Sequence, residues 1–155
     1  MKHNLCIGAL VLWVFTVAGI GWFFVQGWTA KGTDGRTEVR LATAERDLIL
    51  GEMRQLLKTV DQVVRQLGEP LPDRQVIESA ARSAGMGMAA DVNPAIMAKL
   101  PLPFKQMGMS IHRDMDALAD AVAHQETPQQ VLRRLSDMTA RCTTCHDLYR
   151  IGADK

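Results

Sequence analysis

Two cysteines and a histidine stand close together near the C-terminal end of the sequence, in the stretch "ARCTTCHDLYR" at residues 140–150. On a helix, Cys142, Cys145 and His146 fall on one face, because residues three and four apart are neighbours. The C-x-x-C-H spacing is the attachment signature of c-type haem. Two thiols one helical turn apart can form thioethers with the two vinyl groups of a porphyrin, and the adjacent histidine can bind the iron. The motif therefore predicts one covalent haem c with His146 as proximal iron ligand.

Other chemistries of cysteine fit this pattern less well. A structural zinc site needs four ligands, usually from two cysteine pairs, and the sequence has only one further cysteine, Cys6. A thioredoxin-like redox pair requires a βαβ context, which the helical pattern does not provide. A disulfide between Cys142 and Cys145 would be strained inside a helix and would leave His146 without a role. No constellation typical of an enzyme is present, so we expect a haem protein that is not an enzyme.

The first part of the chain has the composition of a membrane helix. Residues 4–30, "NLCIGALVLWVFTVAGIGWFFVQGWTA", contain no Lys, Arg, Asp or Glu, and about 20 such residues cross the hydrocarbon core of a bilayer. Trp22, Phe23 and Trp28 suit the aromatic belt at a membrane interface. A cleaved signal peptide is the alternative, but the apolar run is longer than a typical signal and no good cleavage site follows it. We therefore predict an uncleaved transmembrane anchor.

The remaining chain divides into a short linker and a helical domain. Residues 31–42 are polar and glycine-containing, which predicts a linker, and residues 43–155 form the predicted domain. Four amphipathic patterns occur in it, with an additional short turn expected at Asn93-Pro94; the patterns begin after Thr43, at Pro72, near Phe104 and, with Thr127 as cap, at Pro128. Because the connections are short, these patterns predict an all-α fold, an antiparallel four-helix bundle preceded by one transmembrane helix. With 18 basic and 17 acidic residues, the chain shows no basic face for nucleic acid.

The position of the motif, on the last of four helical patterns and continued as "CTTCHDLYR", resembles the class II c-type cytochromes. This family comprises the cytochrome c-prime group and its low-spin, methionine-ligated relatives, and the resemblance covers about residues 43–152. It implies that Tyr149, after the motif, contacts the haem. The stretch "ERDLILGEM" resembles the first helix of the family, which borders the distal side of the haem. By this resemblance Arg46 reaches a haem propionate, Leu50 occupies the haem-facing position, and Met53 lies one turn further on.

Two distal arrangements remain open, because Leu50 and Met53 share a helix face. With Leu50 over the iron, the sixth position is empty and apolar, which favours small neutral gases such as NO or CO. With Met53 at the iron, the His/Met pair raises the reduction potential and suits electron transfer. His112 could provide a second histidine ligand, but "SIHRDMD" predicts that it lies on the polar face of its helix.

The expected function is therefore that of a monohaem c-type cytochrome, anchored in the bacterial cytoplasmic membrane, which carries single electrons on the periplasmic side. The alternative is a five-coordinate NO- or CO-binding haem protein of the cytochrome c-prime type. The expected orientation follows from haem attachment, which takes place outside the membrane. The positive-inside rule does not predict this orientation, because the basic residues Lys31, Arg36 and Arg40 follow the span. The expected partners are the lipid bilayer and redox proteins in the periplasm or membrane. The resemblance also allows a homodimer through the first two helices of the domain.

Overall fold

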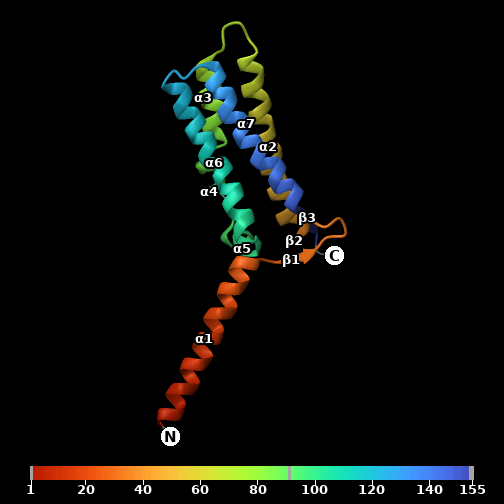
Figure 1. Cartoon of the computed structure of the whole chain (residues 1–155), viewed down its shortest axis with the longest axis vertical. Coiled ribbons are helices and arrows are strands. Elements are labelled where there is room, and N and C mark those ends of the chain that lie inside the picture. Colours follow the sequence, from red (N-terminus) through yellow and green to blue (C-terminus); the bar gives the residue numbers. More distant parts are fainter. Residues whose placement is uncertain (1, 91, 154–155) are drawn as a thin grey trace.

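The computed structural model describes residues 2–90 and 92–153, with side chains described from Cys6 to Gly152 outside this gap. The chain is mostly helical and begins with one long apolar helix, as expected (Figure 1). The elements in chain order are α1 (Lys2–Gln26), β1 (Thr29–Lys31), β2 (Thr37–Leu41), α2 (Thr43–Leu67), α3 (Arg74–Ser83), α4 (Met86–Ala90), α5 (Pro94–Lys99), α6 (Leu102–Ala123), α7 (Pro128–Leu148) and β3 (Tyr149–Ala153). The finer expectation of an all-α four-helix bundle is not confirmed, because six helices follow α1 in the described chain and a small sheet accompanies them.

Helix α1 projects away from the rest of the molecule as a separate rod (Figure 1). Its segment Cys6–Gln26 has 21 residues, a mean hydropathy of 2.1 and no buried residue. At about 1.5 Å per residue this segment rises about 32 Å, close to the thickness of about 30 Å of a bilayer's hydrocarbon core. By length and composition α1 can therefore cross a membrane, a property that it shares with signal sequences.

Helices α2, α3, α6 and α7 pack around the larger of two apolar cores, which we call the upper core (Figure 1). The amphipathic spacing explains this packing, since apolar residues three and four apart form one stripe on each helix. Its least exposed large side chains, one or more from each helix, are Val63, Ile77, Met115, Leu118, Val131 and Met138. The upper core holds together the end of the domain that lies far from α1.

The helix starts follow the expected capping rules at two places. Thr127 caps α7: its hydroxyl accepts from the backbone N–H of Gln130 at 3.3 Å, and the Gln130 side chain accepts from the Thr127 N–H at 2.8 Å. Asn93 caps α5, where its side chain accepts from Ala95 N–H at 2.8 Å and Pro94 takes the first helical position. The beginnings of α7 and of the short turn α5 were therefore predicted correctly.

The segment 31–42, expected to be a linker, instead forms part of a three-stranded sheet of order β1-β2-β3. Strand β2 pairs antiparallel with β1 and parallel with β3, with Val39 opposite Ile151. Val39 and Leu41 of β2 are fully buried, whereas Arg40 between them is exposed. This alternation is typical of a strand, but over so few residues it gave no recognisable pattern in the sequence. The chain therefore enters the domain immediately after α1.

A second apolar core lies at the end of the domain next to α1, and we call it the lower core. It joins the sheet to α2, α5 and α6, and its buried residues are Val39, Leu41, Ile49, Ile96, Leu100 and Phe104. Met53, Cys145 and Tyr149 pack against it. The C-terminal end of the motif helix α7 therefore lies in the part of the domain that adjoins α1 (Figure 1).

Candidate functional site

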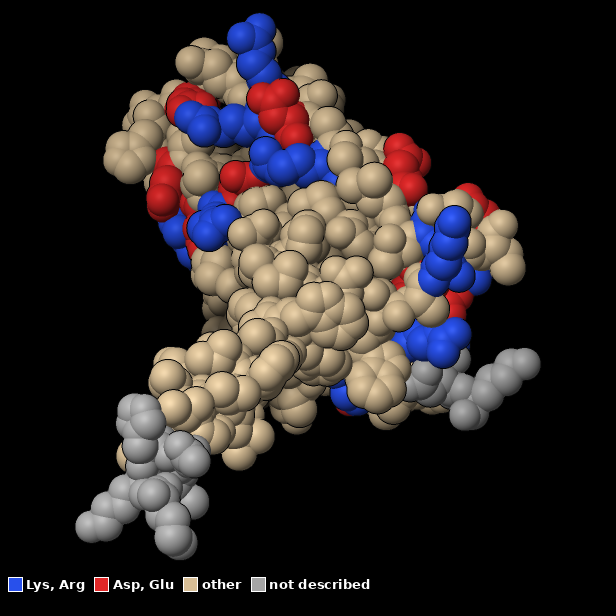
Figure 2. All heavy atoms as spheres, turned by 60° about the horizontal axis from the view of Figure 1, so that its bottom comes forward, with Lys and Arg blue, Asp and Glu red and all other residues tan. Residues whose placement is uncertain are grey.

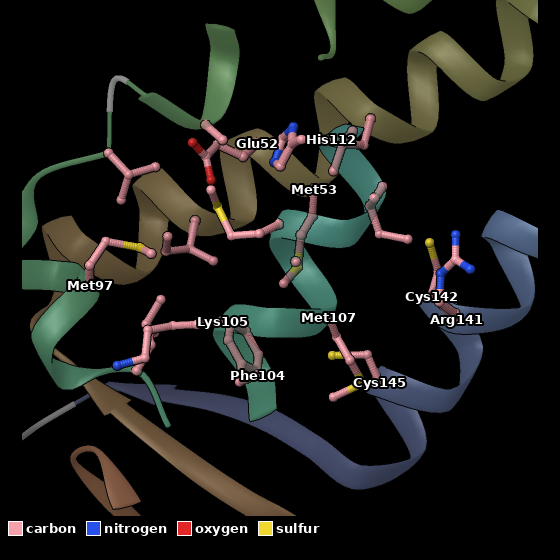
Figure 3. Close-up of a pocket in the computed structure, with 18 of the residues that line it drawn as sticks. Glu52, Met53, Met97, Phe104, Lys105, Met107, His112, Arg141, Cys142 and Cys145 are labelled. Atoms are coloured by element: carbon pink, nitrogen blue, oxygen red, sulfur yellow. The ribbon is translucent and has the colours of Figure 1, made fainter. Parts of the chain in front are cut away.

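A cavity lies between α2, α6 and α7, closed on a further side by α4, α5 and the segment between them (Figure 3). Its volume is about 120 Å³, which is smaller than the range of about 300–1,000 Å³ typical of ligand sites. Most of the lining is apolar, and methionine is prominent in it: Met53, Met97, Met107 and Met109. A cavity with this lining suits an apolar ligand.

Helix α7 brings Cys142, Cys145 and His146 to one wall of this cavity. The expected helical setting of the motif is confirmed, since α7 continues to Leu148. Both cysteines are half-buried free thiols, and His146 is exposed at the edge. Burial raises the pKa of Cys142 and Cys145, so both thiols are protonated at neutral pH. This wall therefore carries two neutral thiols and one imidazole, with Cys145 three residues and His146 four residues after Cys142.

The antiparallel strands β1 and β2 and the turn between them hold the C-terminal end of the motif helix α7. Arg36 Nη1 donates to the carbonyl oxygen of His146 at 3.1 Å, one of the last four carbonyls of α7, which lack partners within the helix. Asp34 accepts from Arg36 at 2.7 Å, and this hydrogen bond lowers the pKa of Asp34 to about 2. Arg150 in β3 donates to Glu38 in β2 at 2.9 and 2.5 Å. The turn between β1 and β2 thus binds the end of the motif helix, and the Arg150–Glu38 pair joins β3 to β2; the sequence revealed neither contact.

The two candidates for the distal side differ in which pockets they line. Met53 lines the cavity together with both cysteines, and Figure 3 shows its side chain turned into the space that Cys145 and Met107 also border. Leu50 does not line this cavity; it lines an adjoining pocket, as do Cys145, His146 and Met53. Helix α2 thus directs Met53, but not Leu50, toward the cavity, although both residues lie on one broad helix face.

Two further residues named by the resemblance lie at the margin of the site or outside it. Arg46 lines neither the cavity nor the adjoining pocket, and its guanidinium binds Asp47 at 2.9 Å. Tyr149 lines the adjoining pocket, and its ring meets Phe104 edge to face at a centroid distance of 5.4 Å. The arginine that does line the cavity is Arg141, which forms an ion pair with Asp114 of α6.

His112 lines the cavity, although the sequence predicted it on the polar face of its helix. The expectation that it lies on the polar face of its helix is wrong: it is 6% exposed and lines the cavity (Figure 3). Its Nδ1 lies 2.8 Å from the carbonyl oxygen of Ala84, and because a carbonyl only accepts, Nδ1 carries the proton. In the neutral ring Nε2 therefore keeps its lone pair. The available signal was the stripe Ile111, Met115 and Leu118, which His112 widens on its buried side.

The comparisons with known proteins give no match for this chain. No family model, no curated protein and no solved structure matches it. Among the residues that the structure describes, no group of three or more His, Cys, Asp or Glu side chains is placed to hold a metal ion. The features that bear on function are therefore the apolar cavity, the motif wall on α7 and the apolar helix α1.

Proposed function

We propose that this chain is a membrane-anchored c-type cytochrome that binds one haem and carries single electrons. The observation that carries the proposal is that Cys142, Cys145 and His146 form one wall of an apolar cavity. The two thiols would hold haem c as thioethers, and His146 would be the proximal iron ligand. When bound, the haem iron supplies a one-electron redox couple whose potential depends on axial ligands and burial.

The residues present fit such a cofactor. The lining is mostly apolar, which matches a porphyrin face, and the two thiols are reduced, unpaired and partly accessible. Anionic propionates need cationic partners, and Arg141 lines the cavity while Arg36 and Arg150 line the adjoining pocket. These arginines are better placed for that role than Arg46, which the resemblance named. Helices α2, α3, α6 and α7 would act as the four-helix frame of the cytochrome.

Met53 is the distal ligand in this proposal. Its thioether is the group on α2 that lines the cavity across from the motif helix, and a His/Met pair favours electron transfer. The gas-binding alternative needs an apolar side chain such as Leu50 over an open iron. Leu50 lines only the adjoining pocket, whereas Met53 lines both this pocket and the cavity that Cys142 borders. This difference supports the electron carrier more than the gas-binding protein.

Helix α1 is the membrane anchor in this proposal. Support comes from its 21-residue apolar segment and from large apolar side chains that have no protein partner to cover them, among them Leu12, Phe15 and Ile20 at 66–72% exposure. A bilayer would remove this surface from water. Haem attachment takes place outside the cytoplasmic membrane, so residues 31–155 would lie in the periplasm. Redox proteins there or in the same membrane are the proposed partners.

The absorption spectrum of the full chain tests this proposal. The chain is produced in a host that matures c-type cytochromes, purified in detergent, and measured oxidised, reduced, and reduced under CO. Low-spin spectra in both redox states without CO binding are the expected result. A high-spin spectrum with rapid CO binding would instead support the gas-binding protein, and a chain without haem absorption would refute both. Leu50→Ala serves as a control, because it should leave the low-spin spectrum unchanged.

A further inference from the structure

The end of α1 is bonded to the globular domain at two points. The backbone N–H of Trp28 donates to the carbonyl oxygen of Lys99, at the end of α5, at 2.6 Å. Lys105 of α6 donates from Nζ to the carbonyl oxygen of Phe24 at 3.1 Å, and its ammonium lies 3.7 Å from the Phe24 ring centroid. Phe24 belongs to the last turn of α1, whose carbonyls lack helical partners and attract a cation. Lys105 is 8% exposed, so this contact is buried in the domain.

Gly27 fixes the direction in which the chain leaves α1. Its φ angle is +65°, a left-handed conformation that glycine adopts without steric cost. A Cβ atom at this position would lie 2.5 Å from both the Lys99 oxygen and the Pro101 nitrogen. The backbone just after α1 therefore lies too close to the α5–α6 connection to leave room for a side chain at this position. Together with the two bonds, this approach joins α1 to the domain without a flexible segment between them.

The surface of the domain around the C-terminal end of α1 carries few charges. Figure 2 shows uncharged atoms where α1 meets the domain, with Lys, Arg, Asp and Glu gathered further out. Six side chains at the end of α1, on α5 and at the start of α6 are exposed or half-exposed, uncharged and mainly apolar: Trp28, Pro94, Ala95, Ala98, Leu102 and Pro103. The exposed charges of Lys31 and Arg40 lie beside them on β1 and β2. The nearby charge of Lys99 is neutralised by Glu45, with its Nζ 2.6 and 2.8 Å from the two carboxylate oxygens. We call the six uncharged residues Trp28, Pro94, Ala95, Ala98, Leu102 and Pro103 the membrane-side face.

The cavity lies directly behind this face. Leu100 and Lys105 both line the cavity, and the same short segment provides the Lys99 carbonyl that binds Trp28. Phe104 connects the two features, since it is buried in the lower core and also lines the cavity. The depth of the membrane-side face relative to the bilayer therefore determines the height of the cavity above it.

We propose that the membrane-side face lies on the headgroup region of the bilayer that α1 crosses, so that α1 and the domain form one body and the cavity is held at the membrane surface. The lipid surface is the occupant because the face is continuous with the apolar helix and adjoins the end at which that helix would leave the hydrocarbon. Trp28, 50% exposed, is the side chain type preferred at this depth. This inference rests on the proposed transmembrane role of α1 and does not depend on the haem.

Lipid quenching of a single tryptophan tests the proposal. Trp28 is kept as the only tryptophan by Trp13→Phe and Trp22→Phe, and the full chain is reconstituted in phosphatidylcholine vesicles with or without lipid brominated near the top of the acyl chains. Bromine should quench Trp28 emission. The control chain carries Trp28→Phe and Leu71→Trp in addition to the two other tryptophan replacements. Leu71 is 90% exposed in the α2–α3 connection, at the end of the domain far from α1 (Figure 1). Bromine should leave the tryptophan emission of this control chain unchanged. Equal, negligible quenching in both chains would overturn the proposal.

The coupling between α1 and the domain is tested by a glycine pair. Gly27→Ala should displace the α5–α6 connection and increase quenching of Trp28 by aqueous iodide, whereas Gly21→Ala, with nothing within 4 Å of its added Cβ, should not. Identical iodide quenching in the two variants would contradict a fixed junction. Retention in vesicles after alkaline washing reports the transmembrane role separately, and visible absorption reports the haem. Release by the wash would overturn the anchor and this inference together, while colourless chain with quenched Trp28 would overturn only the cytochrome.

Discussion

Replacement of Met53 by alanine should change the electronic state of the haem without preventing its attachment. Met53 lines the cavity opposite the motif wall, whereas both cysteines and His146 lie on α7. The variant should therefore remain covalently coloured and lose its methionine ligand. Its sulfur-to-iron charge-transfer band should disappear, and the reduced form should gain CO binding. The reduction potential should fall by on the order of 0.1 V, because methionine ligation lies toward the high end of the range of about 0.8 V that axial ligands span.

The loss of stability in Met53→Ala can be estimated, and Leu50→Ala provides a control with a similar loss. Truncation of a fully buried methionine costs about 2–5 kcal/mol, so a half-buried one such as Met53 should cost about 1–2 kcal/mol. Leu50 is also half-buried on the same helix and does not line the cavity. Leu50→Ala should therefore cost a similar free energy of unfolding and leave the spectrum and potential unchanged. Guanidinium denaturation followed by far-UV circular dichroism gives the stability, and a redox titration gives the potential.

Two outcomes would refute the assignment of Met53. An unchanged charge-transfer band in Met53→Ala would show that another cavity residue binds the iron. Met97→Ala, Met107→Ala and His112→Ala, each truncating a cavity-lining side chain, would then identify it. Loss of the low-spin spectrum in Leu50→Ala alone would instead show that the register of the first helix is shifted by one turn from the proposed one.

Three further predictions concern the domain around the site. Leu41→Ala should cost about 2–5 kcal/mol in a denaturant titration, because Leu41 is fully buried in the lower core; a negligible cost would mean that residues 31–42 act as a linker after all. His112→Ala should cost about 1–3 kcal/mol, since it leaves the Ala84 carbonyl without its donor, and it should keep a low-spin spectrum. Lys99 hydrogen-bonds Glu45 and lowers its pKa below the usual 4.5, so this pair stabilises the fold above that pH and the stabilisation disappears as pH falls through the lowered value. Glu45→Gln should therefore lower the melting temperature at about pH 7 and have a smaller effect at about pH 3, and an equal loss at both values would exclude the ion pair as its cause.

The helices were predictable because their signals are local. The cap at Thr127, the proline after it and the stripe that follows specify α7 without information from the rest of the chain. The same applies to α1, whose composition alone sets it apart. The motif spacing on a helix likewise sufficed to place Cys142 and Cys145 on one wall.

The sheet and the far side of the cavity depend on contacts between distant segments. Strand β2 is recognisable only with β3, about 110 residues later in the chain, beside it, so its five residues carried too little pattern on their own. His112 looked polar among Arg113 and Asp114, and its burial follows from the Ala84 carbonyl that α3 presents to it. The choice between Leu50 and Met53 was equally beyond periodicity. It depends on where α7 and α6 leave space beside α2.

The central claim is that Cys142 and Cys145 hold one haem covalently. The most direct measurement is the intact mass of the denatured full chain, produced in a host that matures c-type cytochromes, together with that of Cys142→Ser/Cys145→Ser. The account predicts that the native chain weighs its polypeptide plus one haem and stays coloured after denaturation, while the double variant weighs its polypeptide alone. A native chain that carries no more than its polypeptide mass would contradict the account.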